Sequence, residues 1–316
     1  FMGSPHEVIA PLKSLMEITQ ITVVAAVSQP ARPVGRKRKL TDPPVATFAK
    51  ENKLKLFQPE SAKEPSFLEE LRKVEPNIII TAAYGQILNE EFLKIPTLGT
   101  VNLHPSMLPA YRGATPVQTA LLKGDKTTGI SVLYTVKQLD AGDIILQKPL
   151  AIYEDETAGA LMHRLFEAYT SVFPEVLNRI TSPLFKAEPQ DVKKATHCAK
   201  ISKTDGLVDW NEMATQIQNK YQALTPWPGI YSFVGKKRIL FTKVTKDQTA
   251  PLEVTQDPGE FFYDKRKKAL IVRCKDSHLS ILKLKPAGSR EVEAAAFWNG
   301  GKFLGKGKFD DAPKQD

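Results

Sequence analysis

The sequence contains little cysteine and no long apolar run. Its 316 residues include only two cysteines, Cys198 and Cys274, which stand far apart with no C-x-x-C pair and no Cys/His cluster around them. This usage argues against a disulfide framework and against a zinc site, so we expect reduced thiols and no bound metal. No apolar stretch approaches the roughly 20 residues that a membrane-spanning helix needs. We therefore expect a soluble protein with no membrane partner.

Several common catalytic signatures are missing as well. The first glycine, Gly3, does not open a G-x-G-x-x-G fingerprint, and no G-x-x-x-x-G-K-[ST] occurs, which disfavours enzymes that bind dinucleotides or ATP. There is no G-x-S-x-G sequence and no cysteine with a plausible histidine partner nearby. Covalent acyl-enzyme chemistry therefore lacks a nucleophile, and any acyl transfer by this chain should be direct.

Positive charge is in excess and unevenly distributed. The formal net charge is +9, and residues 200–316 carry 21 Lys and Arg against 14 Asp and Glu. A second concentration lies at residues 32–39, where five of eight residues are cationic. Both features fit a polyanionic partner such as a nucleic acid, whereas the alternative is an ordinary solvated surface.

The first half of the chain alternates helical and strand patterns. Its continuous apolar runs, such as Ile78-Ile79-Ile80, are typical of strands that are buried on both faces, which predicts an α/β fold with a mostly parallel, Rossmann-like sheet. The patterns predict helices over 5–17, 44–51, 65–74, 115–122 and 157–180, and strands over 21–28, 54–57, 77–84, 99–104, 130–136 and 144–147.

The second half has a different character. Residues 183–202 are polar and lack periodicity, which predicts a linker between a domain of residues 1–182 and a domain of residues 203–316. After one helix over 210–223, short β-prone runs predict a small OB-like β-barrel, an architecture that also suits nucleic-acid binding. The tail from residue 300 should be frayed. The five predicted strands cover 231–234, 238–244, 259–263, 269–273 and 279–285.

Three polar residues could form one reactive site. Asn102 and His104 are two apart at the end of a predicted strand, so they should point to the same side, and Asp140 follows the strand over 130–136. If these strands are neighbours in a parallel sheet, their carboxyl ends open into one crevice. An amide donor, an imidazole and a carboxylate suit acyl transfer to an amine. Alternatively, Asn102 caps backbone groups and Asp140 only forms a turn.

A longer pattern surrounds these residues. It begins at His104 as H-P-S-M-L-P, continues as A-Y-R-G-A-T-P, and ends as L-D-A-G-D at Asp143. The pattern resembles the folate-dependent formyltransferases, which use 10-formyltetrahydrofolate as donor. The resemblance implies that Asn102 and His104 stabilise the tetrahedral oxyanion, and that Asp140 orients His104 and accepts the proton of the amine. It also implies that folate is bound by Ser106, Met107, Leu108, Pro109, Gln86, Ile87 and Leu88.

Two other segments point to the acceptor. Residues 28–39 resemble the basic loop with which the tRNA-dependent members of this family grip the acceptor stem, and residues 225–229, T-P-W-P-G, resemble the entry to their C-terminal barrel. The resemblance implies that the barrel binds tRNA and that the acceptor is the methionyl initiator tRNA of translation. It implies phosphate contacts for Arg32, Arg36, Lys37, Arg38 and Lys39, with Arg36 the most important.

Two rival functions remain open. A formyltransferase for an amino sugar nucleotide would use the same three residues, but the cationic segment would then have no role. In a non-catalytic RNA-binding protein, the three residues would occur together by chance. The family usually has a complete first strand, whereas only Phe1 and Met2 precede Gly3 here, so we expect this strand to be truncated. We expect a monomer in the bacterial cytoplasm, with a mitochondrial or plastid matrix as the alternative.

Overall fold

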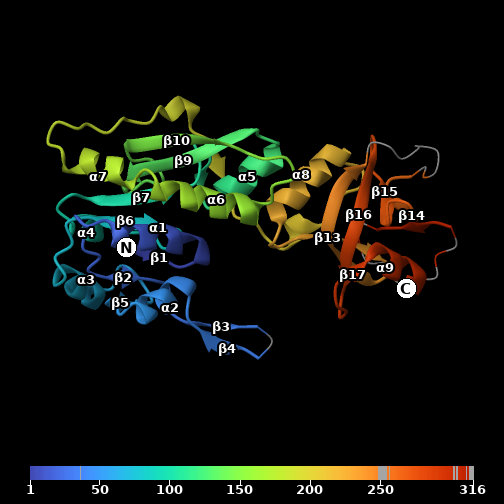
Figure 1. Ribbon diagram of the computed structural model, residues 1–316, viewed down its shortest axis with the longest axis horizontal. Coiled ribbons are helices and arrows are strands. Elements are labelled where there is room, and N and C mark those ends of the chain that lie inside the picture. The colour runs from blue at the N-terminus through green and yellow to red at the C-terminus, as the bar shows by residue number, and fades with distance from the viewer. Residues whose placement is uncertain are drawn as a thin grey trace. The chain divides into compact units, whose positions relative to one another are not determined.

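The structure is a computed structural model that describes residues 1–35, 37–247, 255, 257–301, 303, 305–310 and 312 (Figure 1). It forms two compact units. The first consists of Phe1–Pro116, Thr127–Ala151 and Leu161–Ala199, and the second of Val117–Lys126, Ile152–Ala160 and Lys200–Asp316. None of the helices in the described part is long and apolar enough to cross a membrane.

The first unit is built on a seven-stranded sheet. Its strand order is β10-β9-β7-β6-β1-β2-β5, and the strands from β7 to β5 are parallel, whereas β9 and β10 are antiparallel to their neighbours. The predicted α/β fold with a mostly parallel sheet is therefore confirmed. The strands are β1 (Met2–Gly3), β2 (Ala26–Val27), β5 (Leu56–Phe57), β6 (Ile79–Ala82), β7 (Thr100–His104), β9 (Thr127–Tyr134) and β10 (Ile144–Ala151).

The strands at one side of this sheet are short. β1 has two residues and lies between β6 and β2, with Met2 opposite Thr81 on one side and Val27 on the other. The strand predicted over 21–28 is reduced to β2, because its neighbours β1 and β5 are themselves only two residues long and cannot extend the ladder. A glycine is needed at position 3, since a Cβ there would lie 2.8 Å from the carbonyl oxygen of Ala82.

The helices follow the predicted positions with one correction. The single helix predicted over 157–180 is two helices, α6 (Ala158–Thr170) and α7 (Phe173–Thr181), because Pro174 has no N–H to donate to the carbonyl of Thr170. Proline is tolerated at the start of a helix, where α2 and α3 also carry one. The others are α1 (Ile9–Glu17) after the short η1 (His6–Val8), α2 (Pro44–Glu51), α3 (Pro65–Arg72), α4 (Glu90–Leu93) and α5 (Pro116–Lys123).

Two small sheets complete the first unit. The segment predicted as a basic loop is a hairpin of β3 (Arg32–Val34) and β4 (Lys39–Thr41), which extends away from the main sheet (Figure 1). The other sheet pairs β8 (Arg112–Gly113) with β11 (His197–Cys198) in parallel. β11 belongs to residues 183–202, the segment predicted as a linker, and follows the short η2 (Val192–Lys194).

The second unit is the predicted β-rich domain. Its antiparallel sheet has the order β12-β13-β16-β15-β14-β18, with β17 on β16, and a bridge between Phe233 and Asp310 joins the far end back to β12. The sheet therefore curls into a partial barrel. Its elements are η3 (Thr204–Gly206), α8 (Ala214–Leu224), β12 (Ile230–Val234), β13 (Lys237–Asp247), β14 (Glu260–Asp264), β15 (Ala269–Arg273), β16 (His278–Pro286), β17 (Val292–Glu293), α9 (Ala294–Gly301) and β18 (Gly307–Lys308).

Two differences from the predicted elements involve Trp210 and Phe309, which stack at 5.6 Å in the barrel core. The predicted helix over 210–223 begins only at Ala214, because the Asp209 carboxylate accepts from the Asn211 N–H at 2.9 Å and holds this stretch in a turn. The tail predicted to be frayed supplies β18 and the buried Phe309, while its residues 302, 304, 311 and 313–316 lie outside the described residues.

Candidate active site

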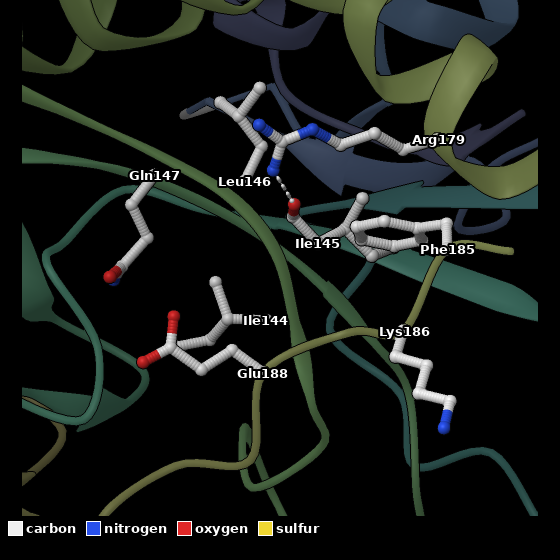
Figure 2. A pocket seen from close by; sticks show the side chains of 8 residues that line it. All are labelled: Ile144, Ile145, Leu146, Gln147, Arg179, Phe185, Lys186 and Glu188. Atoms are coloured by element: carbon white, nitrogen blue, oxygen red, sulfur yellow. Dashed lines mark hydrogen bonds between the residues drawn. The ribbon is translucent and has the colours of Figure 1, made fainter.

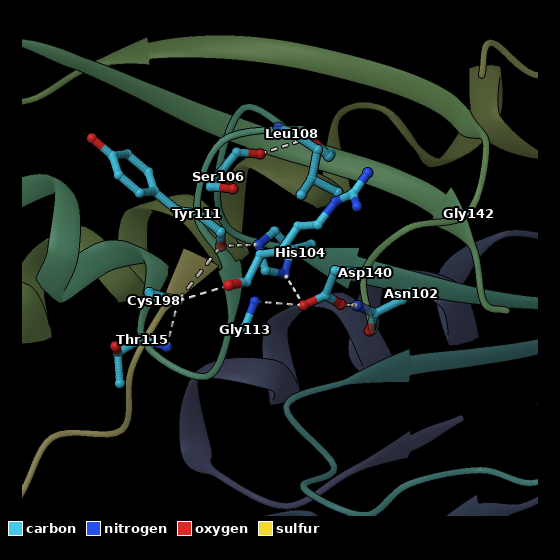
Figure 3. Close-up of polar contacts among 12 residues, drawn as sticks. Asn102, His104, Ser106, Leu108, Tyr111, Gly113, Thr115, Asp140, Gly142 and Cys198 are labelled. Atoms are coloured by element: carbon cyan, nitrogen blue, oxygen red, sulfur yellow. Dashed lines mark hydrogen bonds and ion pairs between the residues drawn. The ribbon is translucent and has the colours of Figure 1, made fainter. Parts of the chain in front are cut away.

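Asn102 and His104 lie on β7, in the interior of the first unit's sheet (Figure 3). His104 is 3% exposed and Asn102 is half-buried. β7 pairs with β6 on one side and with β9 on the other, so its backbone is held on both edges. The two side chains are therefore positioned by rigid secondary structure rather than by a loop.

Asp140 reaches β7 by a different route from the one predicted. The expectation of two parallel strands was wrong, because β9 runs antiparallel to β7, with Leu133 opposite Asn102. Residues 135–143 fold back after β9 and bring Asp140 to the network. Asp140 has a φ of 50°, and Gly142 is required because a Cβ there would overlap the carbonyl oxygen of Tyr134. A tight turn after β9 supplies the carboxylate.

Asp140 contacts both of the other predicted catalytic side chains. The Asn102 amide donates to Asp140 Oδ1 at 3.3 Å, and the backbone N–H of Gly113 donates to Asp140 Oδ2 at 2.8 Å. His104 Nδ1 lies 3.6 Å from the same Oδ2, and the His104 and Asp140 side chains are only 4% and 9% exposed. His104 Nε2 donates to the carbonyl of Tyr111 at 3.0 Å. The carboxylate is therefore held by three groups (Figure 3).

The histidine ring has a defined orientation. A backbone carbonyl can only accept, so Nε2 carries a proton, and Nδ1 is the ring nitrogen that faces the carboxylate. Burial lowers the pKa of His104, while Asp140 and the Tyr111 carbonyl act in the opposite direction. His104 Nδ1 and Asp140 Oδ2 face each other in a buried setting, so a proton taken up by one of them is attracted by the other.

Thr81 is a member of this network that the sequence did not indicate. It lies opposite Asn102 on β6, and its hydroxyl lies 2.9 Å from Asn102 Oδ1. Because the Asn102 NH2 group faces a carboxylate, Oδ1 must face Thr81, whose hydroxyl donates to it. The carboxylate sets the orientation of the amide, and the Thr81 hydroxyl satisfies its oxygen. No local motif marks Thr81, and only the strand order could have revealed it.

The predicted folate segment after His104 is held rigidly. Ser106 is buried and its hydroxyl donates to the carbonyl of Ala110 at 2.7 Å, while the Leu108 N–H donates to Ser131 Oγ at 3.1 Å. The side chains of Met107 and Pro109 are half-buried. Of the four predicted residues, these two present the more accessible side chains, whereas Ser106 and Leu108 shape the loop.

The second predicted folate segment presents one large apolar side chain. Ile87 is 72% exposed, and Leu88 is half-buried against the apolar core of the sheet. Gln86 Oε1 accepts from the Ala62 N–H at 2.6 Å and Nε2 donates to the Glu60 carbonyl at 3.2 Å. Gln86 therefore anchors the segment, and Ile87 is left available to a ligand.

Four of the five predicted RNA-binding cations lie on the β3–β4 hairpin. Arg32, near its base, pairs with Glu60 at 2.7 Å, and both side chains are exposed. Lys37, Arg38 and Lys39 are exposed at the turn and on β4. Arg36, predicted as the most important of the set, lies outside the described residues. The triplet and the 106–109 segment come together around β7, whereas this hairpin follows β2.

A shallow pocket of the first unit has a volume of about 320 Å³ (Figure 2). Its lining contains none of the predicted site residues. Gln147 connects it to the predicted folate segment, since its side-chain amide donates to the carbonyl of Leu108 at 2.8 Å. Among the described residues, no group of three or more His, Cys, Asp or Glu side chains could hold a metal ion.

Comparison with known proteins identifies the family. Residues 2–177 match the formyl transferase family model, and residues 200–302 match the model of the formyl transferase C-terminal domain. The chain is 34% identical to methionyl-tRNA formyltransferase of Ruminiclostridium cellulolyticum over 305 residues, 96% of each chain. It is 36% identical to the enzyme of that name from Macrococcus caseolyticus over 315 residues, 99% of this chain and 98% of that one.

Solved structures share the fold. The sugar 3N-formyl transferase WlaRD, determined in the presence of dTDP and 5-N-formyl-THF, superposes with a TM-score of 0.63 at 16% identity, covering 92% of this chain and 97% of that one. HypX from Aquifex aeolicus, in complex with tetrahydrofolic acid, gives 0.60 at 19% identity over 79% of this chain and 43% of that one. The chain therefore belongs to the formyl transferase family, and relatives that match it over nearly their whole length are methionyl-tRNA formyltransferases.

Proposed function

We propose that this chain transfers the formyl group of 10-formyltetrahydrofolate to the α-amine of methionyl initiator tRNA, and so supports translation initiation. The observation that carries this proposal is the buried contact of Asn102, His104 and Asp140, in a chain whose full-length relatives have this activity by name. The cytoplasm of a bacterium is the proposed compartment, and a monomer is the proposed state.

The chemical step needs stabilisation of an oxyanion. The neutral amine of methionine attacks the formyl carbon, the C=O π electrons move to oxygen, and a tetrahedral intermediate forms. The Asn102 amide has two N–H groups, of which one donates to Asp140, so the other is free to donate to the oxyanion. Asp140 on one side and the Thr81 hydroxyl on the other hold the amide in the orientation that this requires.

Proton transfer is assigned to Asp140 and His104. The attacking amine must lose a proton, and the Asp140 carboxylate can accept it, directly or through water, and share it with His104 Nδ1. Collapse of the intermediate breaks the bond from the formyl carbon to N10, and the pair returns a proton to N10 as tetrahydrofolate leaves. The Tyr111 carbonyl occupies His104 Nε2, so Nδ1 carries this exchange. Because both ring nitrogens face other groups, the contact between His104 and the oxyanion that the resemblance implied is not part of this proposal.

Substrate binding is assigned to the surrounding segments. We assign the folate to the rigid 106–109 segment and to the exposed Ile87 with its neighbours Gln86 and Leu88. The tRNA is assigned to the cations of the β3–β4 hairpin and to the basic C-terminal barrel, because Lys and Arg bind phosphates with little dependence on base sequence.

The test is an assay of formyl transfer from 10-formyltetrahydrofolate to charged initiator tRNA. We expect transfer by the wild-type chain and its loss in His104→Ala and Asp140→Ala. Asp143→Asn is the matched control. Asp143 is exposed, so this substitution removes one charge from the same loop without changing the network. Transfer to an amino sugar nucleotide but not to tRNA would contradict the proposed acceptor, and tRNA binding without any transfer would contradict the proposed chemistry.

A further inference from the structure

Residues 188–199 belong to the segment predicted as a linker, but they pack against the proposed active site. The N–H of Tyr111 donates to Thr196 Oγ1 at 2.9 Å, and the N–H of Arg112 donates to the Thr196 carbonyl at 2.8 Å. β11 then continues beside β8, with Cys198 opposite Gly113. This segment is therefore a wall of the site, formed by a part of the chain whose sequence carries no recognisable catalytic motif.

One side chain of this wall, Gln190, reaches both loops that build the network. Its Oε1 accepts from Arg112 Nε at 3.1 Å and from the terminal guanidinium nitrogen of Arg112 at 2.7 Å. Its Nε2 donates to the carbonyl of Asp140 at 2.9 Å and to the carbonyl of Gly142 at 2.7 Å. These contacts fix the orientation of the amide, because the reverse orientation would place NH2 against guanidinium and oxygen against two carbonyls.

The two loops that Gln190 joins hold the catalytic pair between them. The β8 loop contacts His104 through the Tyr111 carbonyl and Asp140 through the Gly113 N–H. The other loop carries Asp140 itself, in a turn with a φ of 50° at this residue. Since His104 Nδ1 and Asp140 Oδ2 are already 3.6 Å apart, a small displacement of either loop would separate the proton-transfer pair.

We propose that Gln190 is a positioning residue that clamps the Asp140 turn to the β8 loop and thereby sets the distance between Asp140 and His104. It touches neither reacting atom and acts through Asp140. Arg112, which is 7% exposed, provides the fixed point on the β8 side. The kinetic part of this inference rests on the proposed function, whereas the structural part does not.

Gln190→Glu separates this role from a simpler one. A carboxylate at position 190 still accepts from the Arg112 guanidinium, so a residue that only satisfies Arg112 would tolerate the change. It can no longer donate to the carbonyls of Asp140 and Gly142, so the turn is released. Asp191→Ala is the matched control. It removes a carboxylate from the same segment, where that group accepts from the Lys193 N–H, and it leaves the contacts with both loops intact.

Two measurements test the proposal. Hydrogen–deuterium exchange of residues 135–143 should be faster in Gln190→Glu and Gln190→Ala than in the wild-type chain, and unchanged in Asp191→Ala. This readout needs no activity. In the transfer assay, kcat should fall roughly 10- to 100-fold in both Gln190 variants, as expected for a small misplacement of a catalytic group, with the KM values for folate and tRNA nearly unchanged.

The outcomes are distinct. Faster exchange together with a selective loss of kcat supports the clamp. Wild-type exchange in Gln190→Glu would overturn it, whatever the activity of the chain. If the wild-type chain transfers formyl to tRNA and Gln190→Glu retains its kcat, the positioning role is wrong while the proposed function stands. If the wild-type chain fails to formylate tRNA, the proposed function fails, and the exchange result decides the clamp alone.

Discussion

The network around β7 and the β3–β4 hairpin are built in opposite ways. In the network, side chains such as His104 and Asp140 are buried and each polar atom of the Asp140 carboxylate has a partner. On the hairpin, the described cations are exposed, and Arg32 pairs with Glu60 at the surface. Reaction chemistry needs groups held in place, whereas attraction of a polyanion needs charge that faces water.

This contrast predicts that damage to the network lowers kcat and that damage to the hairpin raises the KM for tRNA. The largest effect should come from Asp140→Asn, which preserves shape but removes the charge that faces His104 and accepts the amine's proton. We expect kcat to fall roughly 100- to 1,000-fold with little change in either KM. Asp143→Asn should behave like the wild-type chain. A loss confined to KM would place Asp140 in binding rather than catalysis.

A smaller effect is expected from removing the hairpin's charge. Replacing Arg36, Lys37, Arg38 and Lys39 with alanine should raise the KM for tRNA roughly tenfold at physiological salt and flatten its salt dependence, because fewer counterions are released on binding. The KM for folate should not change. The control removes four cations from other exposed positions, namely Lys13, Lys53, Lys73 and Lys94. An equal rise in that control would show that only net charge matters.

The next largest effect on kcat is expected at Thr81, where the substitution removes a single hydrogen bond. Thr81→Val keeps the shape of the side chain but leaves Asn102 Oδ1 without its hydroxyl donor, so the amide is held less firmly and kcat should fall several-fold to about tenfold. Thr81→Ser retains the hydroxyl and should restore most of the activity. Equal kcat values for the two variants would show that Thr81 acts only through packing.

The smallest effect is expected in the pH dependence of the free energy of unfolding. Burial lowers the pKa of His104 in the folded protein below the ordinary value of 6.5, so the unfolded chain binds the additional proton more readily. The free energy of unfolding should therefore decrease as pH falls below 6.5. Thermal unfolding at about pH 7.5 and about pH 5.5 should show a smaller loss in His104→Asn than in the wild-type chain. The control, His163→Asn, changes an exposed histidine and should lose as much stability as the wild-type chain. If His104→Asn also loses as much as the wild type, the buried histidine contributes nothing to this pH dependence.

Much of the fold could be predicted because its signals are local. The apolar run at Ile78-Ile79-Ile80 marks the buried β6, and the prolines at 44 and 65 mark the starts of α2 and α3. The break before α7 is local as well, because Pro174 lacks the N–H that a continuous helix would need there. The direction of β9 was not predictable in this way, since parallel and antiparallel partners of β7 have the same apolar pattern.

The site was predictable to a similar extent. Asn102, His104 and Asp140 were identified from neighbouring residues that carry a family pattern, and the structure brings them into contact. Thr81 and Gln190 could not be identified, because each contacts the site from a distant part of the chain. Thr81 depends on which strand pairs with β7, and Gln190 depends on the path of residues 188–199. Such contacts are consequences of topology, not of local sequence.

The ion pair between Arg32 and Glu60 also bears on how fast an acceptor could associate. An exposed pair of this kind contributes at most about 1 kcal/mol, but it neutralises one cation near the base of the hairpin. The positive potential is thereby concentrated toward Lys37, Arg38 and Lys39. Exposed charges at the rim of a binding site accelerate diffusional encounter more than they slow dissociation. Glu60→Gln should therefore raise the association rate constant for an anionic partner at low salt and leave its dissociation rate nearly unchanged.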